Sequence, residues 1–104
     1  MASRSPKIDN VYLESGTEKP YTLPDGCTSF EISIRDDNTD KKVRLSYKEG
    51  GTADQTGTED VNDGYREITA DYWIPQNDIK FADSAKIYLR SSADLMVDIT
   101  TFSE

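Results

Sequence analysis

The sequence contains no histidine and only one cysteine, and each shortage excludes certain catalytic, metal-binding or disulfide-bonded arrangements. Without histidine the chain cannot build a Ser-His-Asp or Cys-His nucleophile system, or the usual histidine-containing zinc sites. Cys27 alone cannot form an intrachain disulfide. Asp25 lies close to Cys27, and a neighbouring carboxylate raises the pKa of a thiol, so we expect a small, partly buried residue here. These shortages predict a protein that is not an enzyme.

Long apolar runs and excess positive charge are also missing. No stretch approaches the ~20 apolar residues that span a bilayer, and the first residues, MASRSPK, lack the apolar core of a signal peptide. The chain carries 12 basic and 20 acidic residues, a net charge of −8. An acidic field repels phosphate groups, so nucleic acid and anionic membranes are not expected partners.

The 104 residues suggest one domain. The apolar fraction is only 35% and the mean hydropathy is −0.73. A chain this polar has enough apolar residues for a modest core, and the rest is expected to be loop or arm.

Residues 28–35, TSFEISIR, alternate apolar and polar side chains without a break. A period of two predicts a strand with one face in the core, here the face of Phe30, Ile32 and Ile34. The preceding residues 23–26, LPDG, predict a type I turn with Pro24 in its second position. We expect residues 28–35 to form a central strand.

The same alternation recurs along the chain and predicts further short strands. Residues 42–48 are expected to pair with 28–35 as a hairpin and to point Val43, Leu45 and Tyr47 inward. The regular spacing predicts one small antiparallel β-sandwich or jelly roll of about seven or eight strands over residues 8–104. The remaining expected strands are residues 8–13, 20–23, 66–74, 78–82, 86–90 and 95–102.

Residues 1–7 are predicted to be a short polar arm. Arg4 and Lys7 give it a charge of +2, which leaves −10 for the rest of a chain whose net charge is −8. Two interpretations stay open: a frayed terminus, or a basic arm that lies on a neighbouring acidic surface.

Residues 49–64 are predicted to be a long acidic loop. The segment holds four glycines, five acidic residues and only one apolar side chain larger than alanine, Val61. Loops this long in a small domain are usually functional or disordered, so a solvated loop and an interaction loop are both consistent with the sequence.

Groups of acidic residues suggest either a calcium-binding loop or a glycoside hydrolase site, but the sequence lacks part of the pattern that each of these sites requires. Asp36, Asn38 and Asp40 match positions one, three and five of a calcium-binding EF-hand loop, but Lys41 and Tyr47 stand where glycine and glutamate are required. An ordinary turn is the expectation, with no metal and no cofactor. Glycoside hydrolysis needs two carboxylates at a set distance, which spacing along this chain does not provide for the candidates Asp60, Asp63, Glu67 and Asp71.

Several large apolar side chains fall on the outward phase of their strands. They could cover a second apolar layer, stack on sugar rings, or form a protein interface, where such residues are enriched. We favour the interface. The residues concerned are Tyr12, Trp73, Tyr88, Met96 and Phe102.

Four phrases together resemble a known family: YTLPDGCTSFEISIR, VRLSYKEGG, IKFADSAKIYLRSS and VDITTF. They are similar to small virion proteins of tailed bacteriophages encoded near the major capsid protein. Residues 30–35, FEISIR, and 87–92, IYLRSS, carry the match. The acidic loop at 49–64 is longer than the polar middle of that family.

The resemblance implies a capsid decoration (cement) protein or another accessory head protein. Such a protein binds the outer capsid lattice through the major capsid protein or other virion proteins, often as a trimer, and stabilises the expanded shell. It is found on the virion surface, and in the host cytoplasm during assembly. The expected partner-binding residues are Arg4, Lys7, Tyr12, Trp73, Tyr88 and Phe102. The alternative is a carbohydrate- or receptor-binding β module of a phage fibre or tail.

Overall fold

The computed structural model describes residues 5–35, 42–61, 64–68, 72–73 and 80–103. These residues form strands and loops, and no helix occurs among them. The predicted all-β fold is therefore confirmed. The strands are β1 (Ser5–Leu13), β2 (Lys19–Thr22), β3 (Cys27–Ile34), β4 (Val43–Ser46), β5 (Arg66–Ile68), β6 (Tyr72–Trp73), β7 (Lys86–Ser91) and β8 (Leu95–Ser103).

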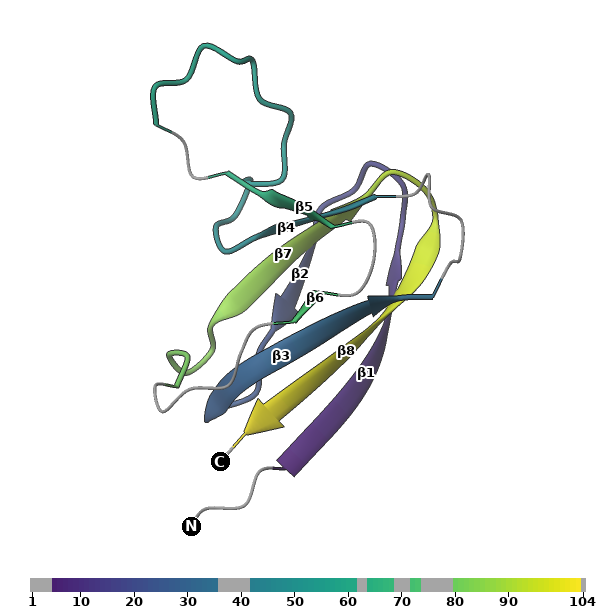
Figure 1. The fold of residues 1–104 in the computed structure, drawn as a ribbon, viewed down its shortest axis with the longest axis vertical. Helices are drawn as coiled ribbons and strands as arrows, with labels where there is room; N and C mark the ends of the chain where they lie inside the picture. The colour runs from purple at the N-terminus through teal and green to yellow at the C-terminus, as the bar shows by residue number, and fades with distance from the viewer. Residues whose placement is uncertain (1–4, 36–41, 62–63, 69–71, 74–79, 104) are drawn as a thin grey trace.

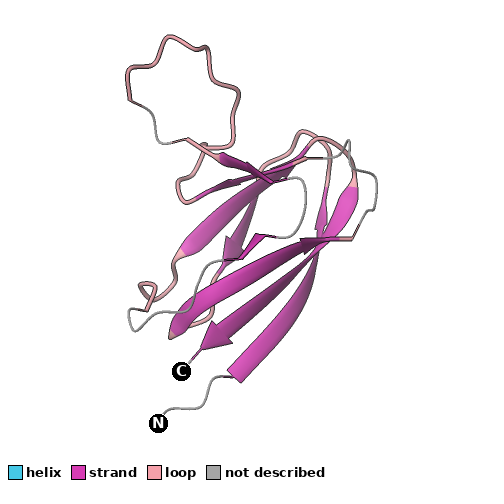
Figure 2. Cartoon of the chain, viewed as in Figure 1, coloured by secondary structure: helices cyan, strands magenta, loops and turns pink. Residues whose placement is uncertain are grey.

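The strands form two four-stranded sheets that pack face to face as a sandwich (Figure 1). Sheet A has the order β1-β8-β3-β6 and sheet B the order β2-β7-β4-β5. Neighbouring strands are antiparallel throughout. Figure 2 shows that loops connect these strands at both ends of the sandwich.

The core lies between the sheets and follows the alternation in the sequence. Phe30 and Ile32 of β3 are fully buried, as are Ile87 and Leu89 of β7 in the opposite sheet. Glu31 of β3 and Tyr88 of β7, which alternate with them, are only half-buried on the outer faces, as a period of two requires. The other buried apolar residues are Leu13, Leu23, Cys27, Val43, Leu45, Ile68, Leu95, Val97 and Ile99.

The predicted hairpin of residues 28–35 and 42–48 is wrong. β3 pairs with β8 and β6 in sheet A, whereas β4 pairs with β7 and β5 in sheet B. Both strands have an apolar face, and in a sandwich those faces can meet across the core instead of lying side by side. Tyr47 is not inward either. β4 ends at Ser46, and the Tyr47 side chain is 54% exposed, although its ring centre lies 6.5 Å from that of Phe30.

The predicted strand 66–74 is in fact two strands in different sheets. β5 pairs with β4, whereas β6 pairs with β3. The alternation continues through both, so the pattern alone could not reveal that the chain changes sheets between Ile68 and Tyr72. The strand predicted at 78–82 does not form within its described part, residues 80–82. There Phe81 instead packs its ring 5.9 Å from that of Phe30.

The turn before β3 lies one residue later than predicted. The amide of Cys27 donates to the carbonyl of Pro24 at 3.2 Å, so Pro24 is the first residue of the turn and not the second. Gly26 has a φ of +76°, in its third position. A positive φ there defines a type II turn and explains the glycine.

The N-terminal strand begins earlier than predicted. Residues 5–7 of the expected arm belong to β1 and pair with residues 101–103. Because β8 is as long as β1, it offers partners for these residues. Arg4 lies outside the described residues.

A hydrogen bond between two side chains ties the two sheets together beside the core. Tyr21 of sheet B donates its hydroxyl to Asp9 Oδ2 of sheet A at 2.5 Å. Burial, together with the adjacent Asp9 carboxylate, raises the pKa of Tyr21 well above its ordinary value. The bond satisfies a phenol that would otherwise be partly buried without a partner.

The burial pattern predicts the effect of removing one methylene from sheet A. Ile32→Val should lower the free energy of unfolding by about 1 kcal/mol, because it leaves a small cavity at a fully buried position. Ile8→Val makes the same chemical change at a side chain that is 65% exposed, and should change stability by less than about 0.5 kcal/mol. Urea unfolding of both variants measures the difference. Equal losses of stability in the two variants would contradict the assignment of Ile32 to the core and of Ile8 to the exposed face.

Candidate functional site

A row of charged side chains crosses the outer face of sheet B. The register places Arg44 of β4 directly opposite Arg90 of β7 on one side and Glu67 of β5 on the other. Like charges that face each other across neighbouring strands are destabilising. The two arginines therefore need acceptors from elsewhere in the chain.

Those acceptors come from the start of the acidic loop and from the turn at Gly16. Arg44 Nη1 donates to the Thr52 carbonyl at 2.9 Å and lies 2.7 Å from Asp54 Oδ1. Arg90 Nε donates to Thr52 Oγ1 at 3.1 Å, and its Nη1 donates to the Gly16 carbonyl. Thr52 is fully buried between the two guanidinium groups although it belongs to a polar loop.

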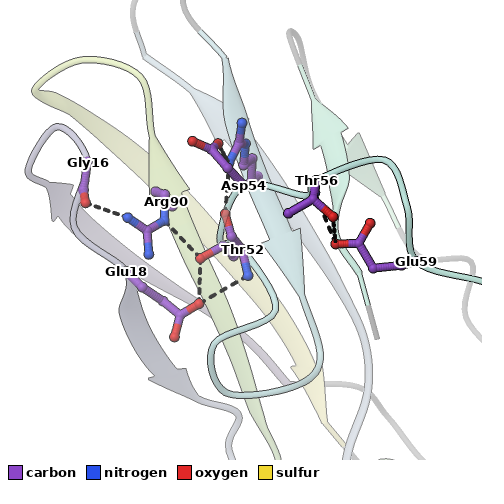
Figure 3. Close-up of polar contacts among 8 residues, drawn as sticks. Gly16, Glu18, Thr52, Asp54, Thr56, Glu59 and Arg90 are labelled. Carbon is purple, nitrogen blue, oxygen red and sulfur yellow. Dashed lines mark hydrogen bonds and ion pairs between the residues drawn. The ribbon is translucent and has the colours of Figure 1, made fainter. Parts of the chain in front are cut away.

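Glu18 completes this arrangement from the turn before β2 (Figure 3). Its carboxylate accepts hydrogen bonds from the amides of Gly50 at 2.9 Å and Thr52 at 3.2 Å, and from the Thr52 hydroxyl. Partial burial alone would raise the pKa of Glu18, but these hydrogen bonds outweigh it and lower the pKa below its ordinary value. We call the four residues Glu18, Arg44, Thr52 and Arg90 the arginine clasp.

Close backbone packing fixes the loop beside the clasp. A Cβ added at Gly51 would lie 2.0 Å from Ser46 Oγ, so no other residue fits there without a shift. Ser46 Oγ also donates to the carbonyl of Gly64 at 3.0 Å, at the other end of the loop. Both ends of the loop are thus held against β4.

The outer part of the loop, residues 53–61, extends away from both sheets (Figure 1) and is exposed. It has internal order. Glu59 accepts hydrogen bonds from the amides of Thr56 at 3.0 Å and Gly57 at 2.9 Å, and from the Thr56 hydroxyl at 2.9 Å. These bonds, the Thr56 amide foremost, lower the pKa of Glu59 to about 2. Val61 is 92% exposed.

A hollow of about 370 Å³ opens beside the arginine clasp. The outward residues of β4 and β7 line it, and the turn at Ser15–Gly16 and the loop residues Ala53–Asp54 border it. Three cations and two carboxylates face this space: Lys42, Arg44 and Arg90, with Asp54 and Glu67.

The residues predicted to bind a partner lie on more than one face of the sandwich, as far as the structure describes them. Tyr12 is 46% exposed on the outer face of sheet A, opposite Met96 of β8. Phe102 is half-buried on the same strand as Met96, six positions further along, or about 20 Å. Tyr88 is half-buried on the outer face of sheet B.

The other predicted residues are less informative. Lys7 is exposed on β1, with its Nζ 3.5 Å from Asp9 Oδ2. Trp73 is in register with Glu31, but its side chain, like Arg4, lies outside the described part of the chain.

The sequence analysis did not identify the arginine clasp. One signal was available. Alternation places Arg44 and Arg90 outward on two strands, and an acidic loop follows the first of them. The buried role of Thr52 had no such signal, because threonine is ordinary in a loop.

The structure adds little to the metal and hydrolase interpretations. Residues 36–40, 63 and 71 lie outside the described residues. Within the described ranges, no group of three or more His, Cys, Asp or Glu side chains is placed to hold a metal ion. Cys27 is buried, which raises its pKa, and its thiol donates to the Ser29 carbonyl at 3.3 Å.

Comparison with known proteins identified no relative of this chain. No protein-family model matches the chain, and no curated protein or solved structure matches it. Among the described residues, no helix has the length and apolar character needed to cross a membrane.

The clasp predicts that Glu18 holds the start of the loop. Glu18→Gln keeps an acceptor but removes the charge that strengthens its hydrogen bonds, which should cost about 1 kcal/mol locally. Hydrogen exchange of the Gly50 and Thr52 amides should then accelerate about fivefold. Glu14→Gln, at an exposed position of the same turn, should leave both rates unchanged. Unchanged rates in Glu18→Gln would contradict the clasp.

Glu59 predicts a pH response confined to the loop. Its pKa of about 2 lies below the ordinary 4.5, so the ionised carboxylate stabilises the turn fully above about 4.5, and this stabilisation is lost as the pH falls through about 2. NMR titration of the Thr56 and Gly57 amides should show that midpoint. Thr56→Ala should move it towards 4.5, whereas Thr22→Ala in β2 should not.

Proposed function

We propose that this chain is a structural virion protein that decorates the outer surface of a tailed-phage head and stabilises it, with no catalytic activity. The observation that carries the proposal is the exposed loop 53–61, extended from a rigid sandwich and ordered by Glu59. Binding segments are typically loops positioned by a rigid scaffold. A loop ordered before binding also loses less conformational entropy when it binds.

The chemistry of the loop is consistent with a protein partner. Asp54, Glu59 and Asp60 are acidic and exposed, and Val61 adds an apolar side chain that is 92% exposed. A partner surface with basic groups around a small apolar depression would complement it, and the major capsid protein is the partner we propose. Weak single contacts would suffice, because many copies on one lattice act together.

Residues outside the loop have secondary roles in this proposal. Arg4 and Lys7 at the start of the chain would contact a neighbouring acidic surface. Tyr12 and Phe102 on sheet A, and Tyr88 on sheet B, would contact adjacent copies in a homo-oligomer, for which we propose a trimer. The virion surface is the proposed location.

The alternative of a carbohydrate- or receptor-binding module has less support. Sugar-stacking sites need aromatic rings aligned in one groove. The exposed Tyr12 and the half-buried Tyr88 belong to opposite sheets.

Co-sedimentation with phage heads tests the proposal. The purified protein should bind mature, expanded heads of the phage that encodes it saturably and in stoichiometric copy number, and unexpanded heads less. The variant Glu59→Ala/Asp60→Lys/Val61→Asp should lower occupancy by about tenfold or more, because it removes both complementary charge and apolar contact.

A matched control separates the loop from general charge effects. Asp83→Lys changes the charge in an exposed turn of the body and should leave occupancy unchanged. Absence of binding to either kind of head would overturn the proposed function. Normal binding of the loop variant would overturn the role of the loop.

A further inference from the structure

The hollow beside the arginine clasp has more hydrogen-bond donors than the chain itself uses. A guanidinium group has five N–H donors. Arg44 uses Nη1, and Arg90 uses Nε and Nη1. No acceptor among the described residues bonds the remaining Nη2 groups. Lys42 Nζ lies 3.9 Å from Glu67 Oε2, its one ion-pair partner in the described part of the chain.

One of the two carboxylates that face the hollow, Asp54, already contacts Arg44. Asp54 Oδ1 lies 2.7 Å from Arg44 Nη1, although the Asp54 side chain is 89% exposed and the Arg44 side chain only 23%. Arg44 is also held from its other side, with its guanidinium carbon 4.3 Å from the centre of the Tyr65 ring. The cation is therefore fixed in place, whereas its anion is solvated at the base of an exposed loop.

We propose that the hollow is a binding site for an external carboxylate group, and that Asp54 occupies part of it as an internal substitute. The incoming carboxylate would replace Asp54 on Arg44 and would also reach the unused donors of Arg90 and Lys42. This inference goes beyond the proposed function, since it needs no capsid.

Two features define the class of ligand. Arginine can bind a planar carboxylate through two parallel hydrogen bonds, and Asp54 already places one carboxylate oxygen 2.7 Å from Arg44 Nη1. Glu67 on the wall and the net charge of −8 disfavour doubly charged tetrahedral anions. The carboxylate could belong to a small molecule or to loop 53–61 of a second copy.

Competition with Asp54 gives the site a distinctive property. A tethered competitor acts at a high effective concentration, in the millimolar range for a short linker, so the external ligand binds weakly while Asp54 is present. Removing the Asp54 charge should therefore strengthen the binding of the external carboxylate. If the Arg44–Asp54 ion pair had only a structural role, its removal would not increase this affinity.

NMR titration with N-acetyl-aspartate amide, at constant ionic strength, tests this inference. Saturable shifts should appear at the Arg44, Arg90 and Ser92 amides and at the arginine Nε groups. Asp54→Asn should tighten binding about threefold to tenfold, and Arg90→Gln should weaken it about tenfold. Lys42→Gln, at an exposed position that the fold tolerates, should weaken it about threefold.

Asp83→Asn is the matched control, since it neutralises an exposed carboxylate in a turn outside the hollow and should leave affinity unchanged. A peptide of residues 53–61 identifies the source. Shifts at the same residues indicate a second copy, and shifts with the small carboxylate alone indicate a small molecule. The proposal is overturned if Asp54→Asn shows no saturable binding, if it binds no more tightly than wild type, or if sulfate binds more tightly than the carboxylate.

Discussion

The opposition of Arg44 and Arg90 across β4 and β7 is the constraint on which the outer face of sheet B depends. Two neighbouring guanidinium groups repel each other, and the fold resolves this by bringing Thr52 between them and Asp54 beside one of them. The direction in which the acidic loop leaves the body follows from that solution. So does the hollow, because the side chains that hold the loop also line the space next to it.

Alternation in the sequence predicted which side chains are buried, but not which strands are neighbours. Phe30, Ile32, Val43 and Leu45 were predicted inward and are buried, because a period of two determines the face of a strand directly. The same period is silent about the partner, so the hairpin of residues 28–48 was wrong. Pairing depends on the whole set of strands, and in a sandwich an apolar face can be covered across the core as well as from the side.

The candidate site was harder to predict than the core, for a physical reason. Its residues come from the turn before β2, from β4, from the loop and from β7, and they meet only when the register of sheet B is known. Arg44 and Arg90 were visible in the sequence as outward cations, but Thr52 and Glu18 have no distinguishing pattern. A polar network depends on distances that separate segments acquire together, whereas a strand depends on its own residues.

The tight fit at Gly51 divides the loop into two parts with different evolutionary freedom. Residues 51–52 form a segment enclosed by Ser46 and the arginine clasp, and a Cβ added at Gly51 would lie 2.0 Å from Ser46 Oγ. Beyond it the chain is surrounded by solvent, and lengthening an exposed loop costs little entropy. The sandwich can therefore accept insertions and sequence drift at residues 55–60 without disturbing its core, which makes this loop a natural position for grafting foreign peptides onto the domain.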